Sequence, residues 1–192
     1  MRMSFVKKMV YAAICSALCV ILPMAFHTIQ NAGMIFLPMH IPVLLCGLIC
    51  GWPYGLACGI MGPCLSCLLT SMPTAVMLPS MALECAVYGC VTGLMMRYVR
   101  TGSGVADLYI SMLTSMVAGR VLAGFAKAWI FNMGTEPFAW VTTSLVAGIP
   151  GIVIQLVLIP LLVVTMTKAH LLPERYSKES LQMQNANCKS AC

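Results

Sequence analysis

Long apolar runs, separated by short polar or proline- and glycine-rich stretches, follow one another from about residue 9 to residue 167. A helix needs about 20 mainly apolar residues to cross the hydrocarbon core of a bilayer. The pattern therefore predicts an all-α membrane protein with six transmembrane helices. The predicted helices cover residues 9–26, 41–50, 54–70, 78–96, 105–131 and 141–167.

The second predicted helix is the shortest, and it ends at a break in the apolar pattern. Residues 51–53 read Gly-Trp-Pro. Because proline lacks a helix donor and glycine relieves a turn, this break predicts a short hairpin between helices two and three. Residues 41–50 are too few to cross a core of about 30 Å unaided. We expect residues 34–40 to extend this helix, or neighbouring helices to shield it.

Composition agrees with a membrane location. The chain has 192 residues, of which 60% are hydrophobic and 8% are charged. Soluble domains carry about 25% charged residues, so an ordinary soluble protein is excluded. A signal peptide does not explain the pattern, because apolar runs continue far beyond the N-terminus. We expect one membrane domain over residues 1–170 and a polar, disordered cytoplasmic tail over residues 171–192.

Lysine and arginine residues lie almost entirely at the ends of the apolar runs, so the net charge of +6 indicates topology and not nucleic-acid binding. The loops at residues 29–39, 71–77 and 132–140 contain neither residue type. With six helices, the flanking basic residues all fall on the side of both termini, which the positive-inside rule assigns to the cytoplasm. These residues are Arg2, Lys7, Lys8, Arg97, Arg100, Lys168, Arg175 and Lys178.

Several kinds of chemistry find no support in the sequence. Nine of the eleven cysteines lie in apolar runs, where cysteine behaves as a small hydrophobe, and we expect Cys64 and Cys67 to pack and not to bind metal. The three histidines are scattered. Phosphate-binding loop, zinc-protease and nucleophile-elbow motifs are absent. We therefore expect no metal site, no cofactor and no catalysis by the chain itself.

Three ionisable residues lie well inside the predicted helices: Glu84, Arg120 and Lys127. Charges within a span are costly, so they usually face a partner or a cavity. Arg120 and Lys127 are seven residues apart and share a helix face, and all three residues fall in the outer half of the membrane. One interpretation is an ion pair that holds the bundle together. The other is a ligand pocket, which the second cation favours.

The candidate pocket extends to further polar and aromatic residues. Trp129 and Trp140 lie near the outer mouth, where they form either an interfacial belt or, with Tyr88, a surface that stacks on a ligand ring. His40 lies before Pro42. The alternative to ligand binding is that His40 caps the start of a helix. The candidate substrate-binding residues are Arg120, Glu84, Lys127, Gln155, His40, Tyr88, Asn132, Trp129 and Trp140.

Three stretches are similar to those of one membrane-protein family: LPMHIPVLLCGLICGWPYGLACGIMGP, ALECAVYGCVTGLMMR and AGIPGIVIQLVLIP. They resemble the substrate-binding S components of energy-coupling factor (ECF) vitamin transporters, and the resemblance covers about residues 5–168. It implies that the hairpin break is a cytoplasmic turn beneath a pocket open to the outside. Many members have an acidic residue where this chain has Pro63 and Cys64, so the resemblance does not assign the vitamin.

The resemblance also implies partners. S components hand their vitamin over when docked on a transmembrane coupling protein that two ABC-type ATPases drive, in the prokaryotic plasma membrane. In the family, small residues four apart on the first helix let the coupling protein approach, and Ala13 and Ala17 match this arrangement. We therefore expect the chain to bind a vitamin, the coupling protein with its ATPases, and the lipid bilayer, but no nucleic acid.

Two other functions stay open at the level of sequence. A stand-alone secondary carrier usually shows internal duplication, which the two halves do not show convincingly, and a channel is the related alternative. An intramembrane enzyme that uses Glu84 or the cysteines needs a second catalytic group, which is not evident. For a binding subunit, the excess positive charge favours a pantothenate-like anionic vitamin. Riboflavin, folate, a pyridoxine-like compound and a queuosine precursor are the alternatives.

Overall fold

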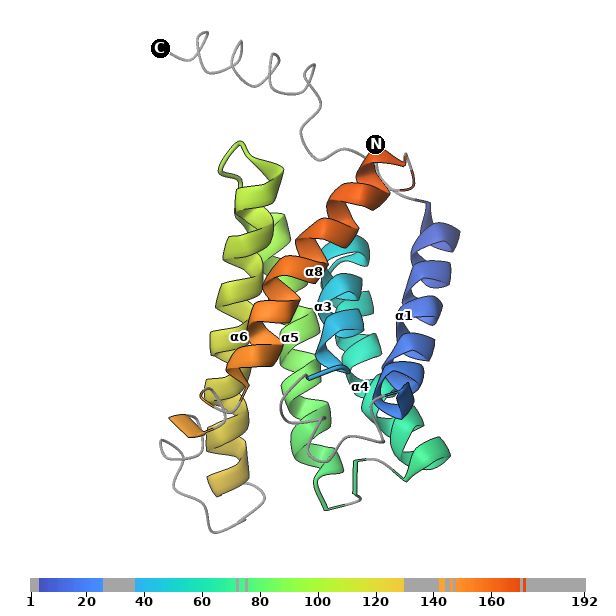
Figure 1. Cartoon of the computed structure of the whole chain (residues 1–192), viewed down its shortest axis with the longest axis vertical. Coiled ribbons are helices and arrows are strands. Elements are labelled where there is room, and N and C mark those ends of the chain that lie inside the picture. The colour runs from blue at the N-terminus through green and yellow to red at the C-terminus, as the bar shows by residue number, and fades with distance from the viewer. Residues whose placement is uncertain are drawn as a thin grey trace, which may run out of the picture.

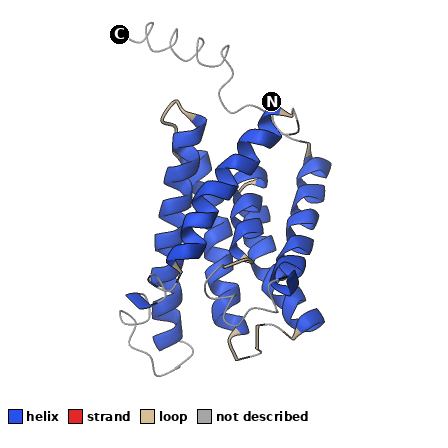
Figure 2. Ribbon diagram, in the orientation of Figure 1, coloured by secondary structure: helices blue, strands red, loops and turns tan. Residues whose placement is uncertain are grey.

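The computed structural model describes residues 4–25, 37–71, 73–74, 76–129, 142–143, 146, 148–169 and 171, and of residues 127–129 it describes only the backbone. Six helices are delimited in this part of the chain (Figure 1): α1 (Phe5–Ala25), α3 (His40–Cys50), α4 (Trp52–Thr70), α5 (Leu78–Tyr98), α6 (Gly104–Trp129) and α8 (Ile149–Lys168). Figure 2 shows no strand in the described residues. All of these helices except α3 are long and apolar enough to cross a membrane, which confirms the predicted all-helical membrane fold.

The predicted hairpin between α3 and α4 turns at a single residue. Gly51 has φ 94° and ψ 175°, a backbone conformation that only glycine adopts without strain. Its N–H donates to the Gly47 carbonyl at 3.1 Å. The predicted break over residues 51–53 is therefore too wide, because Trp52 and Pro53 already form the first turn of α4. Proline is tolerated there, since the first N–H groups of a helix have no partner within it.

Two predicted helix boundaries are wrong for local reasons. The first helix begins at Phe5 and not at residue 9, because Lys7 and Lys8 are polar but favour helix. The last helix begins at Ile149 and not at residue 141. It begins there because the Gly148 N-cap, with φ −87° and ψ 0°, lies outside helical angles and Pro150 occupies the first turn.

The helices are arranged around α5, which lies between α4 and α6 and packs along both. The short α3 packs against α4 and α5, while α1 lies at the edge of the bundle against α4 and α3 (Figure 1). The last helix, α8, crosses the bundle at an angle and contacts α3 and α6. This arrangement places the middle of α5 beside both α3 and α6, the helices that carry the candidate polar residues.

Glycines allow α3, α4 and α5 to approach closely. A Cβ atom on Gly89 of α5 would overlap the Gly55 backbone of α4, and one on Gly47 of α3 would lie 2.6 Å from the Gly89 carbonyl oxygen. Membrane helices associate through such small residues, because lipid provides no hydrophobic driving force between them. The close packing shields α3, which is too short to cross the membrane by itself.

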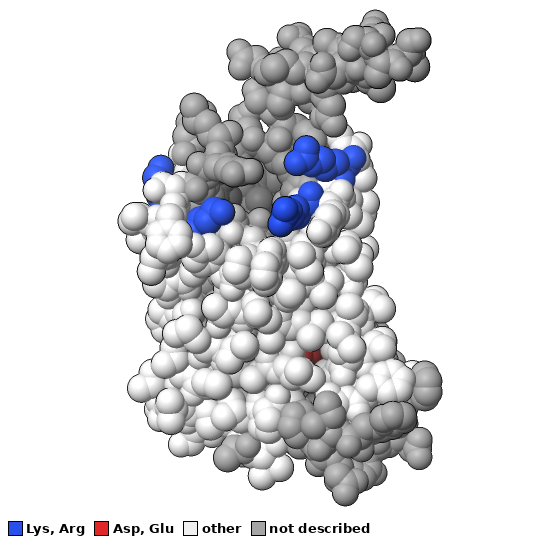
Figure 3. Space-filling view, turned by 180° about the vertical axis from the view of Figure 1, so that it is seen from behind, with Lys and Arg blue, Asp and Glu red and all other residues white. Residues whose placement is uncertain are grey.

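Basic side chains on the described surface gather at one end of the bundle (Figure 3). They come from the start of α1, the end of α5 with the residues that follow it, and the end of α8: Lys7, Lys8, Arg97, Arg100 and Lys168. This one-sided placement is the pattern on which the predicted topology rests. The assignment of that end to the cytoplasm stays a prediction.

Candidate ligand-binding site

Glu84 lies at the centre of a buried polar cluster. Its side chain is on α5, and the residue is 6% exposed. One carboxylate oxygen, Oε1, accepts a hydrogen bond of 2.9 Å from the Tyr88 hydroxyl, one turn along the same helix. The same oxygen lies 3.6 Å from Nε of Arg120 on α6 and 3.7 Å from Nε2 of His40 on α3. Three helices therefore contribute to one site.

Arg120 and Glu84 form a buried ion pair, and Arg120 is 5% exposed. Taking two charges out of water is costly, and their mutual attraction offsets that cost only when the geometry is good. The structure thus brings together two of the three charged residues that the sequence singled out. An ion pair of this kind can hold the bundle, and it can also present charge to a ligand.

The Tyr88 ring is enclosed by protein. It meets the His40 ring edge-on, with ring centroids 4.9 Å apart and planes at 61°. On α6, a Cβ atom at Gly119 would overlap the Tyr88 ring, so the absence of a side chain there makes room for it. Since Tyr88 is 2% exposed and its hydroxyl donates to Glu84, the geometry favours a role in orienting the carboxylate over stacking on a ligand.

His40 is the first residue of α3 and is buried. Neither of its ring nitrogens makes a hydrogen bond with the described residues. A neutral imidazole has one N–H donor and one acceptor nitrogen, and leaving such groups buried without partners costs about 1–3 kcal/mol. His40 therefore has hydrogen-bonding capacity that a small molecule beside Glu84 and Arg120 can use.

Gln155 reaches the same region from α8. The residue is 1% exposed, and its Nε2 donates to the Leu37 carbonyl oxygen at 3.3 Å. Leu37 lies just before α3 and has φ 50°, a left-handed angle that leucine rarely adopts. Gln155 therefore contacts the backbone next to the cluster, and its amide joins α8 to the start of α3.

The other predicted site residues fall outside the described side chains. Lys127 and Trp129 belong to the last turn of α6, but their side chains are not described. Asn132 and Trp140 lie outside the described residues altogether. The second cation and the two tryptophans of the predicted pocket therefore stay predictions.

Sequence reasoning missed Asp107, a fully buried carboxylate near the start of α6. Its Oδ1 accepts bonds from the Thr101 backbone N–H at 2.8 Å and from the Thr101 hydroxyl at 2.7 Å. The signal that could have identified it is an acidic residue in the first turn of a helix, where the helix dipole favours negative charge. Asp107 is more than three turns from Arg120 along α6, so it stabilises the α5–α6 turn and not the polar cluster.

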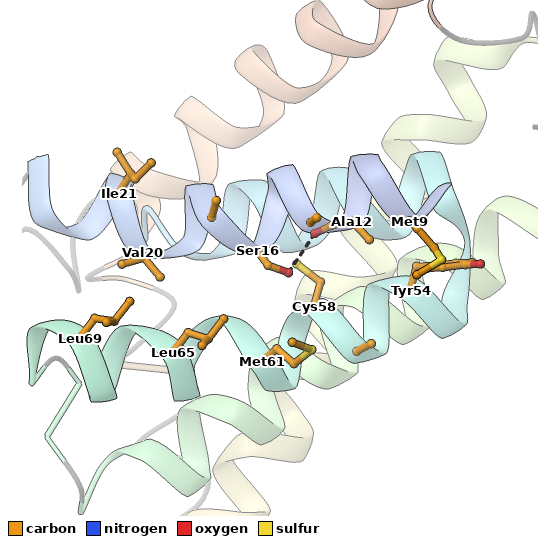
Figure 4. Close-up of a pocket in the computed structure, with 13 residues that line it drawn as sticks. Met9, Ala12, Ser16, Val20, Ile21, Tyr54, Cys58, Met61, Leu65 and Leu69 are labelled. Carbon is orange, nitrogen blue, oxygen red and sulfur yellow. Dashed lines mark hydrogen bonds between the residues drawn. The ribbon is translucent and has the colours of Figure 1, made fainter. Parts of the chain in front are cut away.

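An apolar groove runs along the side of the bundle between α1 and α4 (Figure 4). Side chains from both helices line it, and Ala13 and Ala17 are among them. Ser16 also lines the groove, but its hydroxyl donates to the Ala12 carbonyl of its own helix at 2.9 Å. The other lining residues are Met9, Ala12, Val20, Ile21, Tyr54, Ala57, Cys58, Met61, Leu65 and Leu69. This surface suits contact with another apolar helix.

The cysteines of the described residues are free thiols. Six of them are buried, namely Cys15, Cys19, Cys46, Cys50, Cys58 and Cys85. Among the described side chains, no group of three or more His, Cys, Asp or Glu residues is placed to hold a metal ion. The six buried cysteines belong to the packed core between α1, α3, α4 and α5, whereas Cys64, Cys67 and Cys90 are only partly buried.

Comparison with known proteins identifies one family. The family model described as "ECF transporter, substrate-specific component" matches residues 7–163 of the chain. This match spans all six delimited helices, apart from the first residues of α1 and the last residues of α8. We found no matching curated protein and no matching solved structure.

Proposed function

Because the chain belongs to the family of substrate-specific components of ECF transporters, we propose that it captures a vitamin or related micronutrient outside the cell. As a member of this family it is a multi-pass membrane protein and a transport subunit, not an enzyme. The observation that carries the proposal is the family match over residues 7–163. The buried cluster around Glu84 supplies the polar groups that a ligand would need.

The proposed pocket is centred on Glu84, Arg120 and His40. Ligand sites combine apolar walls with a few well-placed polar groups, and this cluster lies among the buried apolar residues of α3 and α5. In the proposal, Arg120 and His40 contact the ligand and Tyr88 orients Glu84. Towards the outer mouth, the proposal adds the side chains of Lys127, Trp129, Asn132 and Trp140.

We favour an anionic ligand such as pantothenate. A guanidinium group binds a carboxylate through two parallel hydrogen bonds, which a lysine cannot reproduce. Together, Arg120 and Lys127 carry one positive charge more than Glu84 balances. A neutral or ring-containing vitamin such as riboflavin or pyridoxine would depend more on Trp129 and Trp140.

The energy for transport would come from partners. We propose that the α1 side of the groove, with Ala13 and Ala17, docks on a transmembrane coupling protein that two ABC-type ATPases drive. Small residues four apart let a second helix approach closely. The basic end of the bundle would face the cytoplasm of a prokaryotic cell, with both termini on that side.

Thermal unfolding of the purified protein with candidate vitamins tests the ligand proposal. A ligand at about 100 times its Kd adds about 2.7 kcal/mol to the free energy of unfolding, which corresponds to a Tm rise of about 5–10 °C. We expect Arg120→Ala to lose most of this rise and Arg120→Lys to lose part of it.

Arg97→Ala is the matched control, because Arg97 is an exposed cation at the other end of α5. It should keep the full Tm rise. Arg120→Lys retains the charge beside Glu84, so it remains informative if Arg120→Ala does not fold. Equal ligand-induced Tm rises in the wild type and the folded Arg120 variants would make the Arg120–Glu84 pair a purely structural one.

A further inference from the structure

We propose that Gln155 is a positioning residue, which holds the Leu37 carbonyl from α8 and thereby fixes His40 in the pocket. Gln155 would act through His40 and not by touching the ligand. This inference rests on the proposed function, because it assigns His40 to a ligand site. It also makes a prediction about the ligand-free protein that can be tested separately.

The Leu37 carbonyl oxygen receives two hydrogen bonds. The backbone N–H of His40 donates to it at 3.0 Å, and Nε2 of Gln155 donates to it at 3.3 Å. The first bond closes the turn from which α3 begins, and the second comes from α8. One oxygen atom therefore connects α8 to the backbone of the residue whose side chain enters the polar cluster.

The turn before α3 needs such support. Leu37 has φ 50°, and a non-glycine residue stays in this conformation only where its surroundings hold it. The turn is buried, with Leu37 7% and Met39 3% exposed. From the α1 side, the Cys19 thiol contacts the Met39 carbonyl oxygen at 3.8 Å. Gln155 holds the same turn from the α8 side.

The position of His40 depends on this backbone. Its ring makes no hydrogen bond with the described residues, so no such bond ties the imidazole to Tyr88 or Glu84. The ring meets Tyr88 edge-on, and its Nε2 lies 3.7 Å from the Glu84 carboxylate. A buried ring without hydrogen bonds of its own is placed by its backbone and by the side chains packed around it. Loss of the Gln155 amide would therefore let the Leu37 turn relax and move the imidazole.

A double-mutant cycle separates a positioning role from direct contact with the ligand. Gln155→Leu removes the amide at similar size, and His40→Phe keeps a ring but removes its nitrogens. The probe is whichever of pantothenate, riboflavin, folate and pyridoxine stabilises the wild-type protein. We expect each variant to weaken its binding about tenfold, and the double variant to weaken it by about the same factor.

The two alternatives give different results in this cycle. If Gln155 contacts the ligand independently, the two losses multiply to about a hundredfold. If Gln155 only fills space, folded Gln155→Leu binds like the wild type. Either result overturns the proposal. If Gln155→Leu does not fold, Gln155→Met takes its place, because it keeps the length of the side chain but has no amide donor for the Leu37 carbonyl.

The environment of the His40 imidazole can also be followed by NMR without any ligand. The chain has three histidines, so replacing His27 and His170 by Asn leaves one imidazole to follow by NMR. We expect Gln155→Leu to shift the His40 imidazole signals. Val157→Ala, at a residue 64% exposed on the same helix, should leave them unchanged. Unchanged signals in folded Gln155→Leu overturn the proposal, whereas failure of all four vitamins to bind the wild type would count against the proposed function alone.

Discussion

Glu84 owes its fixed position to neighbours on three helices. The Tyr88 hydroxyl donates to its carboxylate from the same helix, while Arg120 and His40 approach it from α6 and α3. A carboxylate buried without such partners would cost several kcal/mol of stability. If the cluster binds a ligand as proposed, its polar groups are already arranged before the ligand arrives, which reduces the entropy lost on binding.

Replacing Tyr88 by Phe tests this arrangement at one atom. Tyr88→Phe keeps the ring that packs against Gly119 and His40 but removes the hydroxyl donor to Glu84. Hydrogen bonds to charged groups contribute about 1.5–3 kcal/mol, so the variant should unfold at a Tm about 3–12 °C lower. Tyr98→Phe, at a residue 70% exposed, should keep the wild-type Tm. A wild-type Tm for Tyr88→Phe would contradict the orienting role.

The sequence predicted part of this cluster. Glu84 and Arg120 could be expected to meet, because a charge inside a membrane span requires a partner. The enclosure of the Tyr88 ring could not be predicted, because it depends on a glycine, Gly119, on a neighbouring helix. The link from Gln155 to Leu37 could not be foreseen either, since it depends on how α8 crosses α3. Spacing within one helix carries no information about such crossings.

At the scale of helices, the hydropathy pattern predicted which helices exist better than it predicted where each helix begins and ends. Five long spans and one short helix follow from the minimum length that a bilayer imposes. The hairpin was predicted because Gly51 and Pro53 interrupt the apolar run, but the actual turn is Gly51 alone. The start of α8 was missed because the backbone at Gly148 and Pro150 decides it, and a hydropathy pattern does not record backbone angles.

The groove between α1 and α4 leads to a prediction about docking. Replacing both Ala13 and Ala17 by Trp fills the α1 side of the groove, so a partner helix can no longer approach closely. Vitamin uptake by cells should be abolished, whereas the isolated variant should bind its ligand with an affinity within about twofold of the wild type.

The control for this experiment is Ile14→Trp. Ile14 is 51% exposed on α1 and is not among the groove residues, so the variant should transport normally. Uptake measured with a radiolabelled vitamin, together with binding to purified protein, separates the two activities. Normal uptake by the Ala13 and Ala17 variant would show that this surface does not couple the subunit to its partner.

At the scale of the molecule, three features occupy different places. The polar cluster lies inside the bundle among α3, α5 and α6, and the apolar groove lies on its side between α1 and α4 (Figure 4). The basic side chains mark one end (Figure 3). This separation suits a subunit that holds its ligand inside and meets its partner along one side. The charge pattern and the six helices delimited in the described residues were predictable from the sequence, whereas the separation of cluster and groove depends on how the helices pack.

Native mass spectrometry of the purified protein tests the central claim most directly. If the chain is a high-affinity binding subunit, the wild type expressed in a vitamin-containing medium should carry one small molecule per chain, and its mass would identify the ligand. Folded Arg120→Ala should lose most of this adduct, because its buried guanidinium is the proposed ligand contact. A wild type that stays free of any small molecule after incubation with the candidate vitamins, or an adduct equally abundant in Arg120→Ala, would contradict the account.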